Sequence, residues 1–169
     1  MFGALFDQSN FLAGILDSDG LLLEVNDTAL AVIGCHRDEV ANQYFPDTPW
    51  WSNDEGKARL KASIKAAQTG ESVTFETVLS TASKGKIDVI VHAHPVQVGQ
   101  QCYIAVTGVD ITERKQAEHS LFRESAKNKA LLHHASDGIT IMDVNANIVE
   151  VSDSFCTMLG YSRDEMIGM

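Results

Sequence analysis

Residues 15–43 read ILDSDGLLLEVNDTALAVIGCHRDEVANQ, and residues 141–169 repeat the pattern as IMDVNANIVEVSDSFCTMLGYSRDEMIGM. The two stretches align without a gap at an offset of 126 positions, and nine of the 29 paired residues are identical. A period of this length is much longer than that of a solenoid repeat, so each copy is expected to begin a whole domain. The second copy reaches residue 169 before such a domain would be complete. We therefore expect the chain to be a fragment of a longer tandem protein.

The composition is that of an acidic globular protein. Hydrophobic residues make up 44% of the 169, which is enough for a packed core, and the net charge is −10. This charge disfavours nucleic acid and anionic membranes as partners. The three cysteines lack any C-x-x-C spacing, which fits a reducing compartment and argues against a zinc ribbon. No apolar stretch approaches the ~20 residues of a membrane helix, so we expect a cytoplasmic location for this piece.

Each copy is expected to fold as a hairpin followed by two short helices. In the first copy, apolar runs at 11–16 and 21–25 flank an Asp-Ser-Asp-Gly turn. The polar residues 26–28 then offer side-chain oxygens that cap a helix, and Gly34 ends it in the left-handed conformation. The pattern His36-x-x-Glu39, which recurs as Ser-x-x-Glu in the second copy, predicts a further short helix.

The residues between 44 and 134 are expected to complete the domain and then leave it as a helix. The segment 44–51 has two prolines and four aromatic residues, which predicts an irregular connector against the core. The pattern Ser52-x-x-Glu55 predicts the start of a helix over 54–69. Three strands are expected at 73–81, 87–98 and 102–111. An exposed helix should then run to about 134, and its mixed heptad pattern fits a weak coiled coil and a plain surface helix equally well.

Four motifs occur together in residues 9–118. They are an Asp19-Gly20 turn before a strand ending at Val25-Asn26, the sequence Arg37-Asp38-Glu39-Val40 after Gly34, the Pro49-Trp50-Trp51 connector, and the closing Asp110-Ile111-Thr112-Glu113-Arg114-Lys115. Together they resemble the pattern of the PAS family. The resemblance covers residues 9 to about 118 as a full domain and 131–169 as a partial one. It implies an α+β fold in which helices lie over one face of a five-stranded antiparallel sheet of order 2-1-5-4-3, followed by a long exit helix.

The resemblance also sets the expected domains and the pocket. We expect a PAS domain over 1–112, a linker or signalling helix over 113–134 and a partial second PAS domain over 135–169. A pocket should lie between the sheet and the helices. Its candidate residues are the larger apolar side chains on facing elements, namely Phe45, Trp50, Trp51, Ile64, Phe75, Val91, Ile104 and Val106.

Trp50 and Trp51 are the residues suited to holding a planar cofactor. An indole beside an apolar pocket can stack on a flavin or a haem, although both tryptophans suit an ordinary core as well. The Asn-Cys-Arg setting of the photoactive cysteine is missing. The helix over 54–69 has no histidine at which the haem-binding members of the family would bind iron. The expected cofactor is therefore none or a non-covalent small molecule such as flavin, with haem disfavoured.

His92 and His94 are the residues that most resemble a metal site. They lie two apart on an expected strand, so their side chains point to the same face with a spacing that suits two metal ligands. The sequence places no acidic partner beside them, and polar residues on a half-solvated sheet face explain them as well. The chain has no phosphate-binding loop and no nucleophile motif. We therefore expect no catalytic and no metal-binding residues, with a small metal-dependent hydrolase as a minor alternative.

The resemblance implies a sensory input module of a histidine kinase or a cyclic-dinucleotide enzyme. We expect a small molecule, a redox state or a gas to act at the pocket, and the change to pass through Asp110, Ile111 and Thr112 into the exit helix. The expected partners are a second copy of the chain, bound through the sheet face and the linker helix, and an output domain of the parent chain. Nucleic acid and membrane contacts are not expected. The alternative is a ligand-free PAS domain that serves as a dimerisation scaffold.

Overall fold

The computed structural model describes residues 6–7, 9–51, 53–82 and 85–168. It divides into two units, residues 1–115 and 116–169. The first unit holds the strands β1 to β5 and the first turn of helix α5, and the second holds the rest of α5 and the second copy of the repeat. Within the described ranges, no helix is both long and apolar enough to cross a lipid bilayer.

The first copy of the repeat folds as predicted. Strands β1 (Leu12–Leu16) and β2 (Leu22–Val25) pair antiparallel, and helices α2 (Asp27–Ile33) and α3 (Arg37–Val40) follow. The Asn26 side chain caps α2 by accepting a hydrogen bond from the Ala29 N–H at 3.0 Å. The same oxygen accepts from the Ala13 N–H at 2.9 Å, so one side chain fastens the helix start to the first strand.

The connector and the long helix α4 follow. The connector contains one 3-10 turn, η1 (Phe45–Asp47), and is otherwise irregular, as its prolines predict. Helix α4 (Asp54–Gln68) is capped by Asn53, whose side chain accepts from the Gly56 N–H. The cap is thus one residue later than predicted, and Ser52 itself lies outside the described residues.

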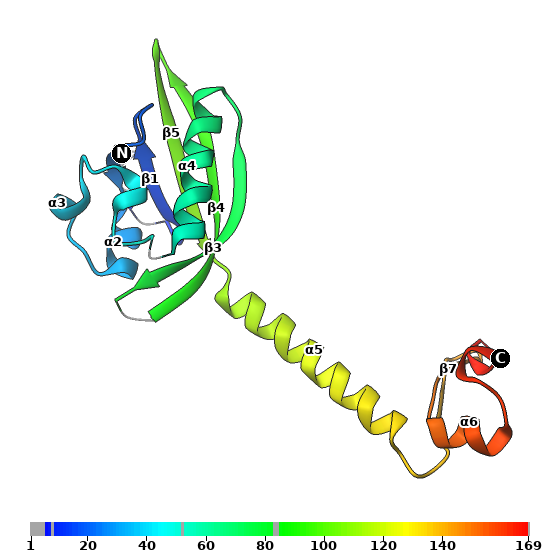
Figure 1. Ribbon diagram of the computed structural model, residues 1–169. Coiled ribbons are helices and arrows are strands. Elements are labelled where there is room, and N and C mark those ends of the chain that lie inside the picture. The colour runs from blue at the N-terminus through cyan, green and yellow to red at the C-terminus, as the bar shows by residue number, and fades with distance from the viewer. Residues whose placement is uncertain (1–5, 8, 52, 83–84, 169) are drawn as a thin grey trace. The chain divides into compact units, whose positions relative to one another are not determined.

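Three long strands complete the sheet. They are β3 (Val73–Thr81), β4 (Gly85–Val98) and β5 (Gln101–Asp110), and the sheet order is β2-β1-β5-β4-β3, all antiparallel. The predicted PAS strand order is confirmed. Helix α4 packs against β3, β4 and β5, and Figure 1 shows it lying along one face of the sheet. On β4 the alternate residues Val89, Val91 and Ala93 are buried under that face.

The second unit repeats the opening of the first. Helix α5 (Thr112–His133) is described throughout and buries none of its residues. It leads to β6 (Thr140–Met142), β7 (Ile148–Val151), α6 (Asp153–Leu159) and α7 (Arg163–Met166). The hairpin register shifts after Ile15 in the first copy and after Ile141 in the second. Gly34 and Gly160 end the equivalent helices with φ values of 80° and 77°.

Identical residues of the two copies make the same hydrogen bonds. Asp17 accepts at 2.9 Å from the N–H groups two and four residues later, and Asp143 does the same at 2.8 and 3.0 Å. Glu39 and Glu165 each accept from the backbone N–H three residues earlier, at 2.9 and 2.8 Å. These side chains satisfy backbone donors at turns and helix starts, which explains physically why both copies carry them.

Candidate functional site

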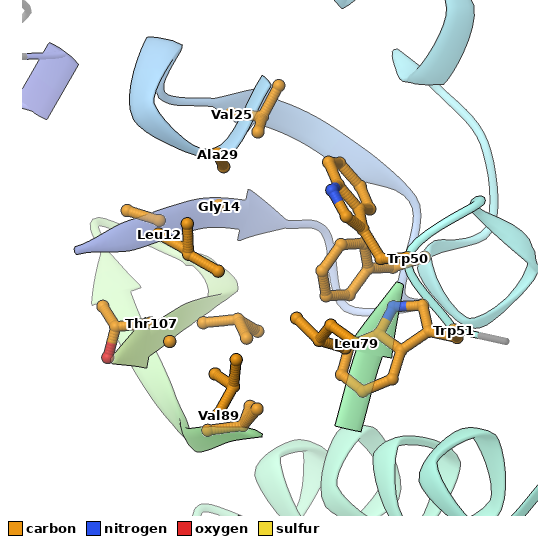
Figure 2. A pocket seen from close by; sticks show the side chains of 14 residues that line it. Leu12, Gly14, Val25, Ala29, Trp50, Trp51, Leu79, Val89 and Thr107 are labelled. Atoms are coloured by element: carbon orange, nitrogen blue, oxygen red, sulfur yellow. The ribbon is translucent and has the colours of Figure 1, made fainter. Parts of the chain in front are cut away.

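The first unit contains an apolar cavity of about 40 Å³ between the sheet and the connector. Strands β1, β2 and β5 and helix α2 supply one part of the wall, and the connector, β3 and β4 supply the rest. Figure 2 shows Trp50 and Trp51 on the opposite side of the cavity from Leu12 and Thr107. The lining residues are Leu12, Ala13, Gly14, Val25, Ala29, Phe45, Trp50, Trp51, Leu79, Val89, Val91, Val106, Thr107 and Gly108.

Three connector aromatics form the rigid part of this wall. The ring of Phe45 meets Trp50 and Trp51 edge-on, with centroid separations of 5.4 and 5.5 Å. Both indoles are 3% exposed. Among the described residues, no group forms a hydrogen bond with the buried indole N–H of Trp51. A buried donor without a partner loses its hydrogen bonds to water and gains none in exchange, so this N–H is unsatisfied in this conformation.

Five of the eight candidate pocket residues line the cavity. They are Phe45, Trp50, Trp51, Val91 and Val106. The other three are buried in the surrounding core. Ile64 of α4 lies next to the turn at Gly20, and Ile104 pairs with Leu16. The ring centroid of Phe75 is 6.4 Å from that of Trp51.

Sequence reasoning missed nine of the 14 lining residues. Among them are Leu12, Gly14 and Gly108 of the paired strands β1 and β5, where Leu12 pairs with Gly108. The search for large apolar side chains passed over the two glycines. A glycine within an otherwise branched strand, which often marks a close approach, was the available signal.

The volume of the cavity limits what it can hold. Pockets for drug-sized ligands are about 300–1,000 Å³. At about 40 Å³, the cavity is several times smaller than these in this conformation.

The end of β5 is tied to its neighbour strand where α5 begins. The Asp110 carboxylate accepts from the Thr112 N–H at 2.9 Å, which satisfies a free donor at the helix start. The backbone of Asp88 on β4 completes the junction, because its C=O accepts from the Ile111 N–H and its N–H donates to Thr112 Oγ1, both at 2.9 Å. The three predicted relay residues, Asp110, Ile111 and Thr112, therefore lie together at this junction.

Ion pairs between the first turn of α5 and the neighbouring strands reinforce the junction. The Lys115 ammonium lies 2.8 Å from Glu76 and 3.0 Å from Asp88, and Arg114 lies 3.3 Å from Glu76. The hydrogen bond from Lys115 lowers the pKa of Glu76, and the hydrogen bonds to Glu76 and Asp88 raise the pKa of Lys115. The first turn of α5 is thus held to strands β3 and β4 as well as to β5.

His92 and His94 lie on β4, on the face away from α4. The His92 ring is 2.9 Å from Thr74 Oγ1 on the neighbouring strand, and His94 is exposed. Within the part of the chain that the structure describes, no group of three or more His, Cys, Asp or Glu side chains comes together in a way that could hold a metal ion.

Comparison with known proteins gives consistent matches. The family model of the PAS fold matches residues 6–116, and a second model of the PAS fold matches 126–169. The sensor histidine kinase TmoS of Ectopseudomonas mendocina is 31% identical over 122 residues, and the hybrid signal transduction histidine kinase D of Dictyostelium discoideum is 27% identical over 132 residues. These alignments cover 69% and 75% of this chain but only 12% and 8% of the two kinases.

A solved structure agrees in fold. The PAS domain of an HTR-like protein from Haloarcula marismortui has a TM-score of 0.54 at 22% identity, over 65% of this chain and 88% of that one.

Proposed function

The chain belongs to the PAS family, and from this premise we propose that its first unit is a sensory input module that binds one small, uncharged molecule in the Trp50–Trp51 cavity. PAS domains are sensory and not catalytic, and the chain is homologous to PAS domains of sensor histidine kinases. We further propose the class of ligand, the residues that bind it and the route by which the signal leaves the sensory unit.

The chemistry of the cavity supports the ligand class. Its wall is almost entirely aliphatic and aromatic, so a charged ligand would lose its hydration with little compensation. The N–H of Trp51 is buried and has no partner among the described residues, so a ligand with one hydrogen-bond acceptor would gain a hydrogen bond there if the connector aromatics shifted to expose it. A larger molecule of the same kind would have to displace the connector aromatics, which would move the connector itself.

The observation that most directly supports this proposal is that strand β5 lines the cavity and ends at the start of helix α5. Val106, Thr107 and Gly108 face or border the cavity, and Asp110 lies two residues further along the same strand. A displacement of β5 by the ligand would therefore act directly on the hydrogen bonds at the start of α5. The ligand would shift the population between two arrangements of this junction, as a two-state relay requires.

The parent protein is proposed from the same comparisons. We expect a cytoplasmic kinase or cyclic-dinucleotide enzyme in which this chain is the input, paired as a homodimer through the sheet face and α5. The chain spans about a tenth of the length of the curated relatives that it matches, so the output domain is part of the proposal.

Two matched substitutions test the ligand site. Trp51→Phe removes the unpartnered indole N–H and keeps a ring, whereas Trp50→Phe removes the same ring volume beside the same cavity and leaves the Trp51 N–H in place. We expect the small molecule released from purified wild-type protein, detected by mass spectrometry, to be retained by Trp50→Phe better than by Trp51→Phe. In the ligand-free state the two variants should melt at similar temperatures.

Two results would count against a sensory pocket. The first is that no small molecule is released from the wild-type protein and no uncharged compound raises its melting temperature. The second is that both variants lose the ligand equally, which would remove the role given to the Trp51 N–H.

A scaffold without ligand is the second candidate, and specific surfaces favour it. Leu23 and Val109 on the sheet face away from the helices are 38% and 43% exposed, and Leu121 and Phe122 on α5 are 67% and 72% exposed. Such surfaces are typical of protein contacts. A stable dimer that releases no small molecule, and whose dissociation by Val109→Asp abolishes output in the parent protein, would favour the scaffold.

A further inference from the structure

In each copy of the repeat, one arginine contacts acidic side chains on several neighbouring elements. We call this arginine and its partners the arginine clamp, which is centred on Arg37 in the first copy and on Arg163 in the second. In the first copy Arg37 lies 3.3 Å from Glu24 on β2, 3.0 Å from Asp27 at the start of α2 and 3.7 Å from Asp7. A single guanidinium thus joins α3 to the hairpin, to α2 and to the segment before β1. Arginine suits this task because its planar fork can serve several acceptors at once.

The second copy has the same clamp with one different member. Arg163 lies 2.7 Å from Asp153 at the start of α6 and 3.8 Å from Glu150 on β7, and it donates to the Val151 C=O at 3.0 Å. Its remaining partner is the imidazole of His133, the last residue of α5, whose Nε2 is 2.7 Å from Arg163 Nη1. His133 Nδ1 in turn lies 3.4 Å from Asp153.

Asp7 and His133 occupy equivalent positions. They are separated by the repeat offset of 126 residues, although they precede the stretch in which the two sequences are visibly alike. Hydrogen bonds of the two cap side chains show that the structural repeat extends upstream at least to residues 11 and 137. The Ala13 N–H donates to the Asn26 cap and the Ile139 N–H donates to the Ser152 cap, and both caps also donate to the C=O two residues before those donors.

We propose that protonation of His133 loosens the second arginine clamp, whereas the first clamp, which has Asp7 at the equivalent position, lacks this response. Histidine is the side chain whose ordinary charge change lies between pH 5 and 8, and an ordinary carboxylate is ionised across that interval. The two copies would then differ in one regulatory property while sharing the same scaffold.

The geometry requires a neutral imidazole. Arg163 donors lie against both ring nitrogens, Nη1 against Nε2 and Nη2 against Nδ1, and a ring nitrogen can accept only while it carries no proton. Protonation removes the acceptor and places two cations within hydrogen-bonding distance. The groups that face His133 are Asp153 from α6 and Arg163 from α7, with Glu150 of β7 behind Arg163, while Lys129 and His134 are neighbours on α5 itself.

These neighbours determine the direction of the change. Asp153 attracts the imidazolium, so the contact between α5 and α6 should persist after protonation. Arg163 repels it, so the contact between α5 and α7 should be lost. Because α5 is the helix that leaves the sensory unit, the proton would set how firmly that helix holds the second copy.

The test is an exchange of the two equivalent residues in the full chain. The Nη signals of Arg163 and Arg37 are followed by NMR from pH 8 to pH 5, together with the His133 ring. In the wild-type protein the Arg163 signals should shift with the same midpoint as the His133 ring, and the Arg37 signals should stay in place. His133→Asp should abolish the Arg163 shift, and Asp7→His should confer a shift on Arg37.

Control variants keep the test decisive. His134→Asn removes the neighbouring imidazole and should leave the Arg163 response unchanged. If His133→Asp disturbs the fold of the second copy, His133→Asn keeps an acceptor that does not titrate and should abolish the response equally. Arg163 signals that stay constant while His133 titrates, or that shift as strongly in both His133 variants, would overturn the proposal.

Discussion

Gly20 and Ala146 hold the same left-handed position in the two hairpin turns, with φ values of +87° and +67°. Alanine at such a position is strained by about 1–2 kcal/mol, whereas glycine is not. A side chain at Gly20 would also come within 3.0 Å of Ile64 and Tyr44. The turn at Gly20 therefore requires glycine both for its positive φ and for the close contacts around it. The turn at Ala146 has no glycine, and its backbone is strained.

Exchanging these residues should change stability in opposite directions. Gly20→Ala should destabilise the first unit by ~1–3 kcal/mol, because strain and close contacts add. Ala146→Gly should stabilise the second by up to ~1 kcal/mol, since relief of strain exceeds the greater entropy of glycine in the unfolded chain. Denaturant unfolding of the full chain, with residue-resolved probes in each unit, measures both. A stabilising Gly20→Ala would contradict the packing around this turn.

At the residue scale, the aromatic part of the cavity wall was predictable from the sequence. Phe45, Trp50 and Trp51 were identified because bulky apolar residues in a Pro-rich connector have to pack against the core. Gly14 and Gly108 were not, because they contribute space instead of a side chain and their meeting depends on the pairing of β1 with β5. Ile64 and Phe75 were assigned to the pocket because apolarity does not distinguish a cavity wall from the core behind it.

At the element scale, the junction of β5 and α5 is held by two kinds of contact. Hydrogen bonds of Asp110 and Asp88 set the position of the helix start, and ion pairs of Lys115 hold the first turn on β3 and β4. Asp110→Ala removes one helix-start acceptor and should destabilise the first unit by about 1 kcal/mol without unfolding it. We expect the parent protein to lose most of its response to the stimulus, because the first turn can then fray independently of the strand.

The measurement for Asp110→Ala is output activity of the parent with and without stimulus, beside the melting temperature of this chain. Asp110→Asn is the matched control, since its amide oxygen can still accept from the Thr112 N–H. A parent carrying Asp110→Ala that responds with normal amplitude would exclude this junction as the route of the signal.

The ion pairs at the junction should depend on pH in the acid range. Because the pKa of Glu76 is lowered in the folded protein, its contribution is present above the ordinary carboxyl pKa of about 4.3 and is lost as the pH falls through the lowered value. The Lys115 side-chain NMR signal should therefore move toward that of a free lysine below about pH 4. Glu76→Gln should reduce this change, and an unaltered titration of Lys115 in that variant would contradict the assignment.

Elements with a local sequence signal were predicted almost to the residue. The caps, the left-handed glycines and the alternating strands are all set by residues within a few positions of one another. The Glu76, Asp88 and Lys115 cluster was missed because Lys115 is 27 residues from Asp88 and 39 from Glu76, and the three come together only through the pairing of β3 with β4 and the exit of α5. Nothing in the local sequence around any of the three predicts the other two.

At the scale of the whole molecule, two hairpins of the same design lie in different surroundings. In the first unit β1 pairs with both β2 and β5 and lies on the core. In the second unit, among the described residues, β6 pairs with β7 alone. Its described buried side chains are few, namely Val151, Ser152 and Met166, whereas Ile141, Val149 and Met158 are about half exposed or more. A two-stranded hairpin with so little burial is only marginally stable.

Hydrogen exchange of the full chain should therefore separate the two hairpins. Ile15 and Ile141, and likewise Glu24 and Glu150, are identical residues at equivalent positions, so their amides form matched pairs. We expect the second-copy amides to be at least ~100-fold less protected than their partners in β1 and β2, because they exchange by local opening while the first unit requires opening of its core. The exchange must be measured at a concentration where the chain is monomeric, because strand exchange between chains would protect the amides of β6 from solvent. Equal protection of the matched amides in a monomer would show that the second copy has a stabilising contact of its own, and would refute the marginal stability inferred from its burial.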